Sequence, residues 1–191
     1  DLHRRRHSFP TRRSSDLDKD YLTYVNIPES TEKSTLQRLQ SAGFEPSKYV
    51  VFHISSRLPV NRWKIDKFLK LASLISVYAG LKVAVTGAPN SDEERAARTL
   101  FCSDRVRYFT TSSLAELGVM CKHSKCFVTL DGGAMHYGAV FAPSVVAIFG
   151  KTNVDTWRPY CQNAVVVASE SKVADDVAVE TVYKNLTDML R

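Results

Sequence analysis

Two hydrophobic patterns alternate along the chain, and together they predict its fold class. Short unbroken apolar runs rich in aromatic and β-branched residues, such as Tyr49–Ile54, predict buried strands. Longer stretches with apolar residues three or four positions apart predict helices, as over Ile65–Tyr78, which Gly80 is expected to end. Because the two patterns alternate, we expect βαβ units, a parallel sheet and right-handed crossovers, which form a Rossmann-like three-layer α/β domain.

Caps, glycines and apolar runs place the expected elements along the sequence. The expected strands or β-prone runs are Tyr21–Ile27, Tyr49–Ile54, Lys82–Thr86, Val106–Phe109, Cys126–Leu130, Val145–Phe149 and Val165–Ala168. The expected helices run from Ser30 or Thr31 to about Ala42, over Ile65–Tyr78, from the cap Ser91 to Leu100, from Ser112 or Ser113 to about Lys122, over Gly133–Phe141 and over Val173–Leu190.

Ligands of such folds bind beyond the carboxyl ends of the strands, so functional residues are expected in the loops there. In the loop Gly150–Arg158, Trp157 is expected either to pack on a ligand or to close the core. The five loops are Ser55–Trp63, Thr86–Ser91, Thr110–Ser113, Asp131–His136 and Gly150–Arg158.

The segment Asp131-Gly132-Gly133-Ala134-Met135-His136 carries the strongest chemical signal. It follows a predicted strand and opens a helix, and its two glycines let the backbone approach a ligand with free N–H groups. The positive potential at a helix N-terminus favours a phosphate. Asp131 is expected to order the loop or to accept from a sugar hydroxyl, and His136 to donate to the ligand. The alternative is a glycine-rich turn with a capping aspartate and a half-buried histidine.

Hydroxyl and guanidinium groups follow the predicted strand that contains His53. Ser55 and Ser56 can donate to phosphate oxygens, and a polar loop with no special role explains them equally well. Arg57 and Arg62 flank the rest of this loop, where a guanidinium suits bidentate phosphate binding. Solvated arginines are the alternative.

Composition narrows the class of protein without assigning a function. The 191 residues are 44% hydrophobic and 24% charged, which suits one globular domain and excludes collagenous and disordered classes. No apolar run approaches the roughly 18 residues of a membrane helix, so at most peripheral membrane association is expected. The four cysteines form no Cys-x-x-Cys pair, so we expect reduced, buried thiols in a cytoplasmic protein, and no metal site.

The net charge of +6 divides equally between residues 1–17 and the remainder of the chain. Residues 1–17 hold five arginines and resemble translated sequencing-adapter DNA, so we expect an artefactual or disordered segment; a basic arm for nucleic acid is the alternative. The remainder shows no basic stripe with interleaved aromatics, so nucleic-acid binding is not expected. Residues 18–48 are expected to be a linker and remnant leading into a domain at 49–191.

Several segments occur together in the order used by glycosyltransferase family 9, which includes the ADP-heptose:lipopolysaccharide heptosyltransferases. The C-terminal domain of this family resembles the chain from about Val50 to Pro159. The matching segments are the strand with His53 and its small-residue loop, Thr86-Gly87, Ser113-Leu114-Ala115-Glu116-Leu117, Asp131–Ala139, and Ser144–Gly150 with Thr152, Trp157 and Pro159.

The resemblance implies the C-terminal half of a GT-B architecture, in which two Rossmann-like domains face each other across a cleft. This half would hold the nucleotide-sugar donor, commonly ADP-heptose. The other half would hold a lipopolysaccharide-core or related glycan acceptor and the general base, in an inverting reaction without metal or cofactor. Fixed N–H donors would stabilise charge that develops on the diphosphate leaving group. The implied donor-binding residues are Ser55, Ser56, Arg62, Asp131, Gly132, Gly133 and His136.

The chain departs from the family pattern at four positions. The family's loop lysine falls at Asn61, and Arg62 or Lys64 is the expected replacement for its charge. Lys64 itself stands where proline is usual, Ser55 where glycine is usual, and Gly132 where the family has a hydroxyl. These departures leave the donor sugar open.

No second Rossmann domain precedes residue 18 in this sequence, so we expect a donor-binding half without an acceptor site or catalytic base. Such a chain is expected to bind a nucleotide sugar weakly and to transfer nothing by itself. The alternatives are a non-catalytic nucleotide-sugar-binding module and a GT-B NDP-sugar epimerase. The expected location is the cytoplasm or the inner face of the bacterial inner membrane.

Overall fold

A six-stranded parallel sheet is the centre of the fold in the computed structural model, which describes residues 25–191. The strand order is β3-β2-β1-β4-β5-β6, so the chain builds one half of the sheet outward from β1 and the other half outward from β4. The predicted Rossmann-like α/β class is confirmed. The strands are β1 (Tyr49–His53), β2 (Lys82–Thr86), β3 (Val106–Tyr108), β4 (Cys126–Leu130), β5 (Val145–Phe149) and β6 (Ala164–Ala168).

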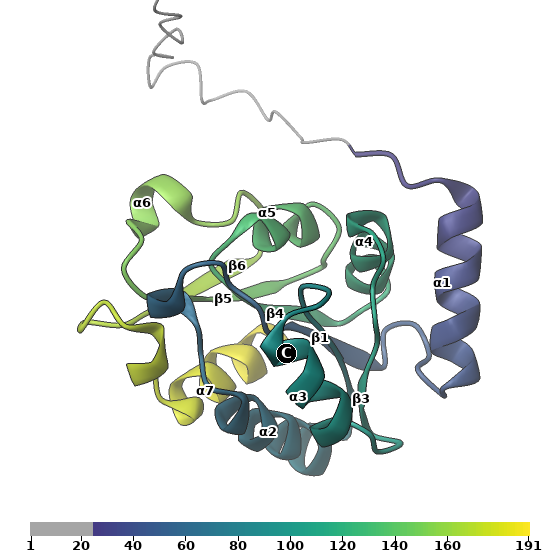
Figure 1. The fold of residues 1–191 in the computed structure, drawn as a ribbon, viewed down its shortest axis with the longest axis horizontal. Coiled ribbons are helices and arrows are strands. Elements are labelled where there is room, and N and C mark those ends of the chain that lie inside the picture. Colours follow the sequence, from purple (N-terminus) through teal and green to yellow (C-terminus); the bar gives the residue numbers. More distant parts are fainter. Residues whose placement is uncertain (1–24) are drawn as a thin grey trace, which may run out of the picture.

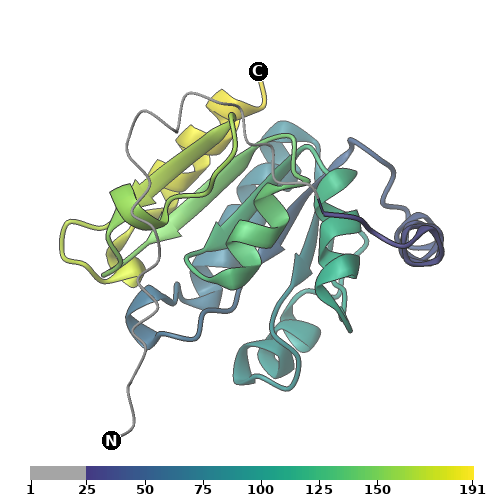
Figure 2. The ribbon, with the colours of Figure 1, turned by 90° about the horizontal axis from the view of Figure 1, so that it is seen from above.

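Helices cover both faces of the sheet and complete the three layers (Figure 1). One face carries α2 (Ile65–Leu74), α3 (Asp92–Leu100) and α7 (Val179–Met189). The other carries α4 (Leu114–Lys122) and α5 (Gly133–Ala139), with α1 (Glu29–Ser41) packed against α4. Figure 2 shows α1 lying outside this layer, at the side of the domain.

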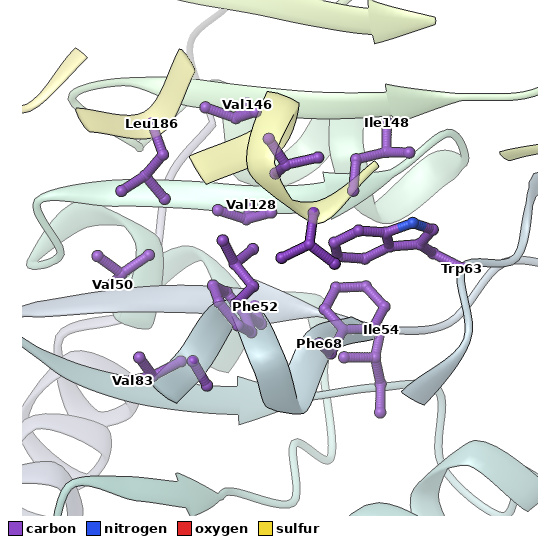
Figure 3. Packing of buried hydrophobic residues seen from close by; sticks show 14 of the residues in the cluster. Val50, Phe52, Ile54, Trp63, Phe68, Val83, Val128, Val146, Ile148 and Leu186 are labelled. Atoms are coloured by element: carbon purple, nitrogen blue, oxygen red, sulfur yellow. The ribbon is translucent and has the colours of Figure 1, made fainter. Parts of the chain in front are cut away.

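Each face of the sheet has its own core, because successive side chains of a strand point to opposite sides. Val50 and Phe52 of β1 lie in the core under α2 and α7, whereas Val51 lies in the core under α4 and α5. In the first core the Trp63 and Phe68 rings pack edge to face, with centroids 4.9 Å apart (Figure 3). Each fully buried side chain of this size stabilises the fold by about 1.5–3 kcal/mol.

The first segments of the chain differ in part from expectation. The interpretation of residues 1–17 lies outside the described residues, as does most of the run Tyr21–Ile27, whose last three residues form no strand. Helix α1 begins directly after Pro28 with no side-chain cap, so the predicted caps Ser30 and Thr31 are wrong. The Pro28 carbonyl instead accepts the first hydrogen bonds of the helix, from the N–H groups of Thr31 and Glu32, both at 3.0 Å.

The segment expected to lead into the domain contributes to its core. Leu39 and Phe44 are fully buried against the α4 and α5 side of the sheet. Gly43 follows the helix in a left-handed conformation with φ of 77°, which is typical of a glycine that ends a helix. The boundary between residues 48 and 49 stays a prediction.

The single helix predicted over Val173–Leu190 is wrong in its first third. A 3-10 turn over Ala174–Asp176 and an extended Val177 precede α7. The Val177 carbonyl accepts hydrogen bonds from Trp63 Nε1 at 3.0 Å and from Lys67 Nζ at 3.3 Å. These bonds come from a distant part of the chain, so the local periodicity could not predict the break.

The predicted helix Ile65–Tyr78 has nearly its expected extent. It consists of α2 followed by a π-helical turn, η3 (Ile75–Ala79), and Gly80 ends it in a left-handed conformation with φ of 66°. The remaining short elements are the 3-10 turns η2 (Pro59–Asn61) and η4 (Ala174–Asp176) and helix α6 (Val154–Trp157).

The cysteines and the helices of the structure bear on two expectations from composition. All four cysteines carry free thiols, and Cys121 and Cys126 are buried whereas Cys102 is exposed. The prediction of buried thiols is therefore confirmed for two of them and wrong for Cys102. None of the helices in residues 25–191 has the length and hydrophobicity that crossing a bilayer requires.

Helix α5 packs so closely on β4 that Gly138 has no room for a side chain. A Cβ at this position would lie 2.4 Å from a ring carbon of Phe127, which is fully buried. We predict that Gly138→Ala lowers the free energy of unfolding by about 1–3 kcal/mol, because the ring has to move within a packed core. Urea denaturation measures the change. Gly133→Ala, in the same helix with open space around the new methyl group, is the control, and equal stabilities of the two variants would contradict the account.

His53 ends β1 with an imidazole that is only 9% exposed, and its Nδ1 has no hydrogen-bond partner among the described residues. Burial lowers the pKa of His53 to about 4, because a charged ring is costly away from water. In the unfolded chain the ring takes up its proton near pH 6.5. The folded protein therefore holds this histidine neutral.

The low pKa of His53 predicts a specific loss of stability in acid. Between pH 6.5 and pH 4 the unfolded state binds this proton and the folded state does not, so the stability falls as the pH falls. We expect wild-type protein to lose about 3 kcal/mol more than His53→Asn between pH 7.5 and pH 4. Denaturant unfolding at each pH measures the difference, and parallel pH profiles would contradict the low pKa.

Candidate functional site

A pocket of about 1010 Å³ opens at the carboxyl edge of the sheet. All five loops predicted from the sequence contribute to its lining, so their convergence on one site is confirmed. One residue from each loop illustrates this, in chain order: Ser56, Gly87, Ser112, Gly133 and Thr152. The pocket crosses the point between β1 and β4 where the strand order reverses, which is the usual ligand position in such sheets.

The turn between β4 and α5 presents unpaired backbone N–H groups to the pocket. None of the described residues accepts a hydrogen bond from the N–H of Gly132, Gly133 or Ala134. These three residues line the pocket and are exposed or half-buried. Gly132 is extended, with φ of 160° and ψ of 178°, and Gly133 begins the helix. Because Gly132 is extended, its N–H and that of Gly133 point to opposite sides, whereas the N–H groups of Gly133 and Ala134 both point toward the N-terminus of the helix that they begin. The turn therefore offers donors to a negatively charged group.

Asp131 and His136 stand on either side of this turn, and both line the pocket. The Asp131 side chain is 8% exposed, and its Oδ2 accepts from Asn61 Nδ2 at 2.7 Å. The half-buried His136 ring meets the Trp157 ring in an edge-to-face arrangement, with centroids 6.3 Å apart. Trp157 is 52% exposed, so the alternative that it closes the core is wrong, and contact with a ligand stays a prediction.

The two serines after β1 use their hydroxyls within the protein. Ser55 Oγ accepts from the Ala88 N–H at 2.9 Å, which ties the loop after β2 to the loop after β1. Ser56 Oγ donates to the Asp131 carbonyl at 3.0 Å, so its proton is already engaged. In this arrangement Ser55 still has a proton to donate to a ligand, whereas Ser56 has only lone pairs to offer.

The two loop arginines differ in how they are held. Arg62 Nε donates to the Ser56 carbonyl at 2.9 Å, and its Nη1 lies 3.0 Å from Glu93 Oε1. Arg57 also lines the pocket and forms no ion pair with any described residue. The pocket lining thus holds two guanidiniums, from Arg57 and Arg62, and two carboxylates, from Glu93 and Asp131. The formal charges of these four side chains cancel.

Two side chains of the site, Asn61 and Thr152, and the short helix beside it were not predicted from the sequence. Asn61 and Thr152 line the pocket and are joined by a hydrogen bond of 2.9 Å, but Asn61 attracted notice only as the replacement of a lysine. The short helix α6, which carries Trp157, was expected to be loop. Its signal was Asn153, whose side chain caps the helix by accepting from the Thr156 N–H at 3.2 Å.

Comparison with known proteins identifies relatives of this chain. The chain is 25% identical over 147 residues to lipopolysaccharide heptosyltransferase 3 of Escherichia coli strain K12, a match that covers 75% of this chain and 42% of that protein. The chain thus spans less than half the length of this relative.

Two solved structures share the fold at 20% identity. The glycosyltransferase family 9 protein of Veillonella parvula gives a TM-score of 0.76 over 87% of this chain and 53% of that protein. The E. coli heptosyltransferase WaaC with ADP gives 0.68 over 76% of this chain and 45% of that protein. The sequence model of the family described as glycosyltransferase family 9 (heptosyltransferase) matches residues 5–187 of this chain. Because this match extends over nearly the whole sequence, the chain belongs to glycosyltransferase family 9.

Proposed function

We propose that this chain binds the nucleotide-sugar donor of an inverting, metal-independent glycosyltransferase. The observation that carries the proposal is the set of unpaired N–H groups at Gly132, Gly133 and Ala134, three residues that line the pocket. A diphosphate needs such donors, and their hydrogen bonds to charged oxygens are about twice as strong as bonds between neutral groups. Membership of glycosyltransferase family 9 supports the same class of ligand.

We propose an ADP-sugar, with ADP-heptose first, as the donor. A volume of about 1010 Å³ suits a ligand of this size, since small-molecule sites measure roughly 300–1,000 Å³. The pocket lining includes the His136 and Trp157 rings, which follow β4 and β5, and the apolar side chains of Pro89 and Leu114, which follow β2 and β3. The solved structures of WaaC with ADP and with ADP-2-deoxy-2-fluoro heptose support adenine nucleotides as the first ligands to test.

In the proposed transfer reaction, the contribution of this chain is mainly a set of fixed hydrogen-bond donors. Breaking the bond between sugar and diphosphate leaves negative charge on the leaving group. N–H groups already aimed there stabilise the transition state more than the bound substrate. The glycan acceptor and the general base are proposed to belong to a second domain, and the reaction to take place in the cytoplasm or at the inner face of the inner membrane.

Removing one backbone donor tests the proposal most selectively. Gly133→Pro deletes the N–H, and Gly132 before it is extended and not helical, which avoids the clash between a proline ring and a preceding helical residue. Gly133→Ala adds a Cβ in the same place but keeps the N–H. We expect a Kd for ADP about 10–100 times higher for the proline variant than for the alanine variant, because a hydrogen bond to a charged group contributes about 1.5–3 kcal/mol. Isothermal titration calorimetry measures both constants.

Two results would count against the proposal. Equal affinities of the two Gly133 variants would show that this N–H does not hold the diphosphate. No binding of ADP or ADP-heptose by the wild-type chain up to millimolar concentration would contradict the donor site altogether. A titration with UDP-GlcNAc, expected to bind more weakly, tests whether the pocket selects the adenine nucleotide.

A further inference from the structure

The Asn61 side chain is the most completely enclosed polar group in the pocket lining, with 1% of the residue exposed. It lies at the end of η2, where three loops of the carboxyl edge meet. Its Nδ2 donates to Asp131 Oδ2 at 2.7 Å and to Thr152 Oγ1 at 2.9 Å. Its Oδ1 accepts from the Lys151 N–H at 3.1 Å. One amide thereby joins the loops that follow β1, β4 and β5.

These three bonds require both halves of a primary amide. The Nδ2 group donates one hydrogen bond to each of two acceptors, and Oδ1 accepts one from a backbone N–H. Both the donor and the acceptor of the amide therefore have partners. A carboxylate has no proton to donate, an ammonium has no acceptor, and an aliphatic side chain has neither. Asparagine is therefore matched to this position by chemistry as well as by size.

The surrounding backbone is shaped to bring the loops this close. A Cβ at Gly150 would lie 2.4 Å from the Val60 carbonyl oxygen and 2.8 Å from Asn61 Oδ1. Only glycine lets the end of β5 approach the η2 loop to the distance at which the Lys151 N–H reaches Asn61. The close approach and the hydrogen bonds thus support one another.

The contacts of Asn61 extend directly to the proposed donor site. Asp131 precedes the Gly132 and Gly133 amides, and it is tied twice to the loop after β1. Its carboxylate is held by Asn61, and its carbonyl accepts from Ser56 Oγ at 3.0 Å. If the carboxylate were released, it would be a freely turning negative charge beside the place where a diphosphate is expected. Holding it fixes both the loop and the direction of that charge.

We infer that Asn61 is a positioning residue for the donor pocket. It holds the Asp131 carboxylate and the Thr152 loop so that the Gly132 and Gly133 amides stay in binding geometry, and it does not bind the phosphates itself. This inference rests on the proposed donor-binding function.

Several charged side chains lie on the segments around Asn61 and determine the electrostatic environment of a new side chain at this position. The facing loops carry Asp131 and Lys151, the loop of Asn61 itself carries Arg62, and the neighbouring η4 carries Asp175 and Asp176. The Asp175 carboxylate pairs with Lys64, and the Asp176 carboxylate accepts from Ser171. Among the described residues, Asp131 is the one whose carboxylate is hydrogen-bonded to the Asn61 side chain.

Substitution by aspartate gives a readout that a purely structural role would not move. Asn61→Asp sets a second carboxylate against Asp131, and two carboxylates this close share one proton. We expect ADP to bind at least tenfold more weakly than to wild type at pH 8, and to recover to within about threefold at pH 5.5, where the pair holds that proton. Taking the ratio to wild type at each pH cancels the titration of ADP itself.

Three further variants and one control variant complete the experiment, each measured by ADP titration with the unfolding midpoint recorded alongside. Asn61→Ala is expected to lose at least tenfold in affinity, and Thr152→Val, which removes one acceptor, about threefold. Asn61→Lys restores the family's cation and is expected to bind ADP no more tightly than wild type. Asn185→Ala, on the distant helix α7, is the control and should bind as wild type does.

The outcomes separate this inference from the proposed function. If wild-type protein does not bind ADP, the proposed function fails. If wild type binds, the inference is overturned by wild-type affinity in Asn61→Ala, by a pH-independent ratio in Asn61→Asp, or by a tenfold gain in Asn61→Lys. If Asn61→Ala does not fold, Asn61→Asp at pH 5.5 and Thr152→Val decide the question.

Discussion

The N–H groups at the start of α5, which no part of the described chain accepts, are the physical feature on which the site depends. A buried donor without a partner costs about 1–3 kcal/mol, so proteins leave few of them. Here the residues that carry the donors line a pocket instead of the interior, so water or a ligand can satisfy the donors. The hydrogen bond between Asn61 and Asp131 holds the turn that carries them. An anion that binds there gains hydrogen bonds without reorganising the backbone.

The sheet and its two cores hold this turn in place. Five buried residues of β4 lead directly into it, and Gly138 brings α5 against Phe127 on the same strand. The carboxyl ends of parallel strands lie at one edge, so the loops after β1, β2, β3 and β5 reach the same pocket. The apolar layers therefore set the position of the polar groups, although none of the core side chains carries the proposed chemistry.

The sequence predicted features whose causes are local and missed those whose causes are distant. Apolar runs located β2, β4 and β5 to the residue, and Ser91 capped its helix as expected, because runs and caps depend on near neighbours. The break before α7 depends on Trp63, more than a hundred residues away. The pocket loops followed from the fold class. The hydrogen bond from Ser56 Oγ and the three hydrogen bonds of Asn61 could not be predicted in this way, because their partners come from other loops.

The most direct measurement is the amide NMR spectrum of ¹⁵N-labelled protein during titration with ADP. If the diphosphate sits on the turn after β4, the Gly132 and Gly133 amide protons shift downfield in proportion to occupancy, as expected for N–H groups that donate to charged oxygens. Amides on the far side of the sheet, such as those of α7, should stay in place. Saturation by ADP with unchanged Gly132 and Gly133 resonances, and shifts elsewhere, would contradict the account.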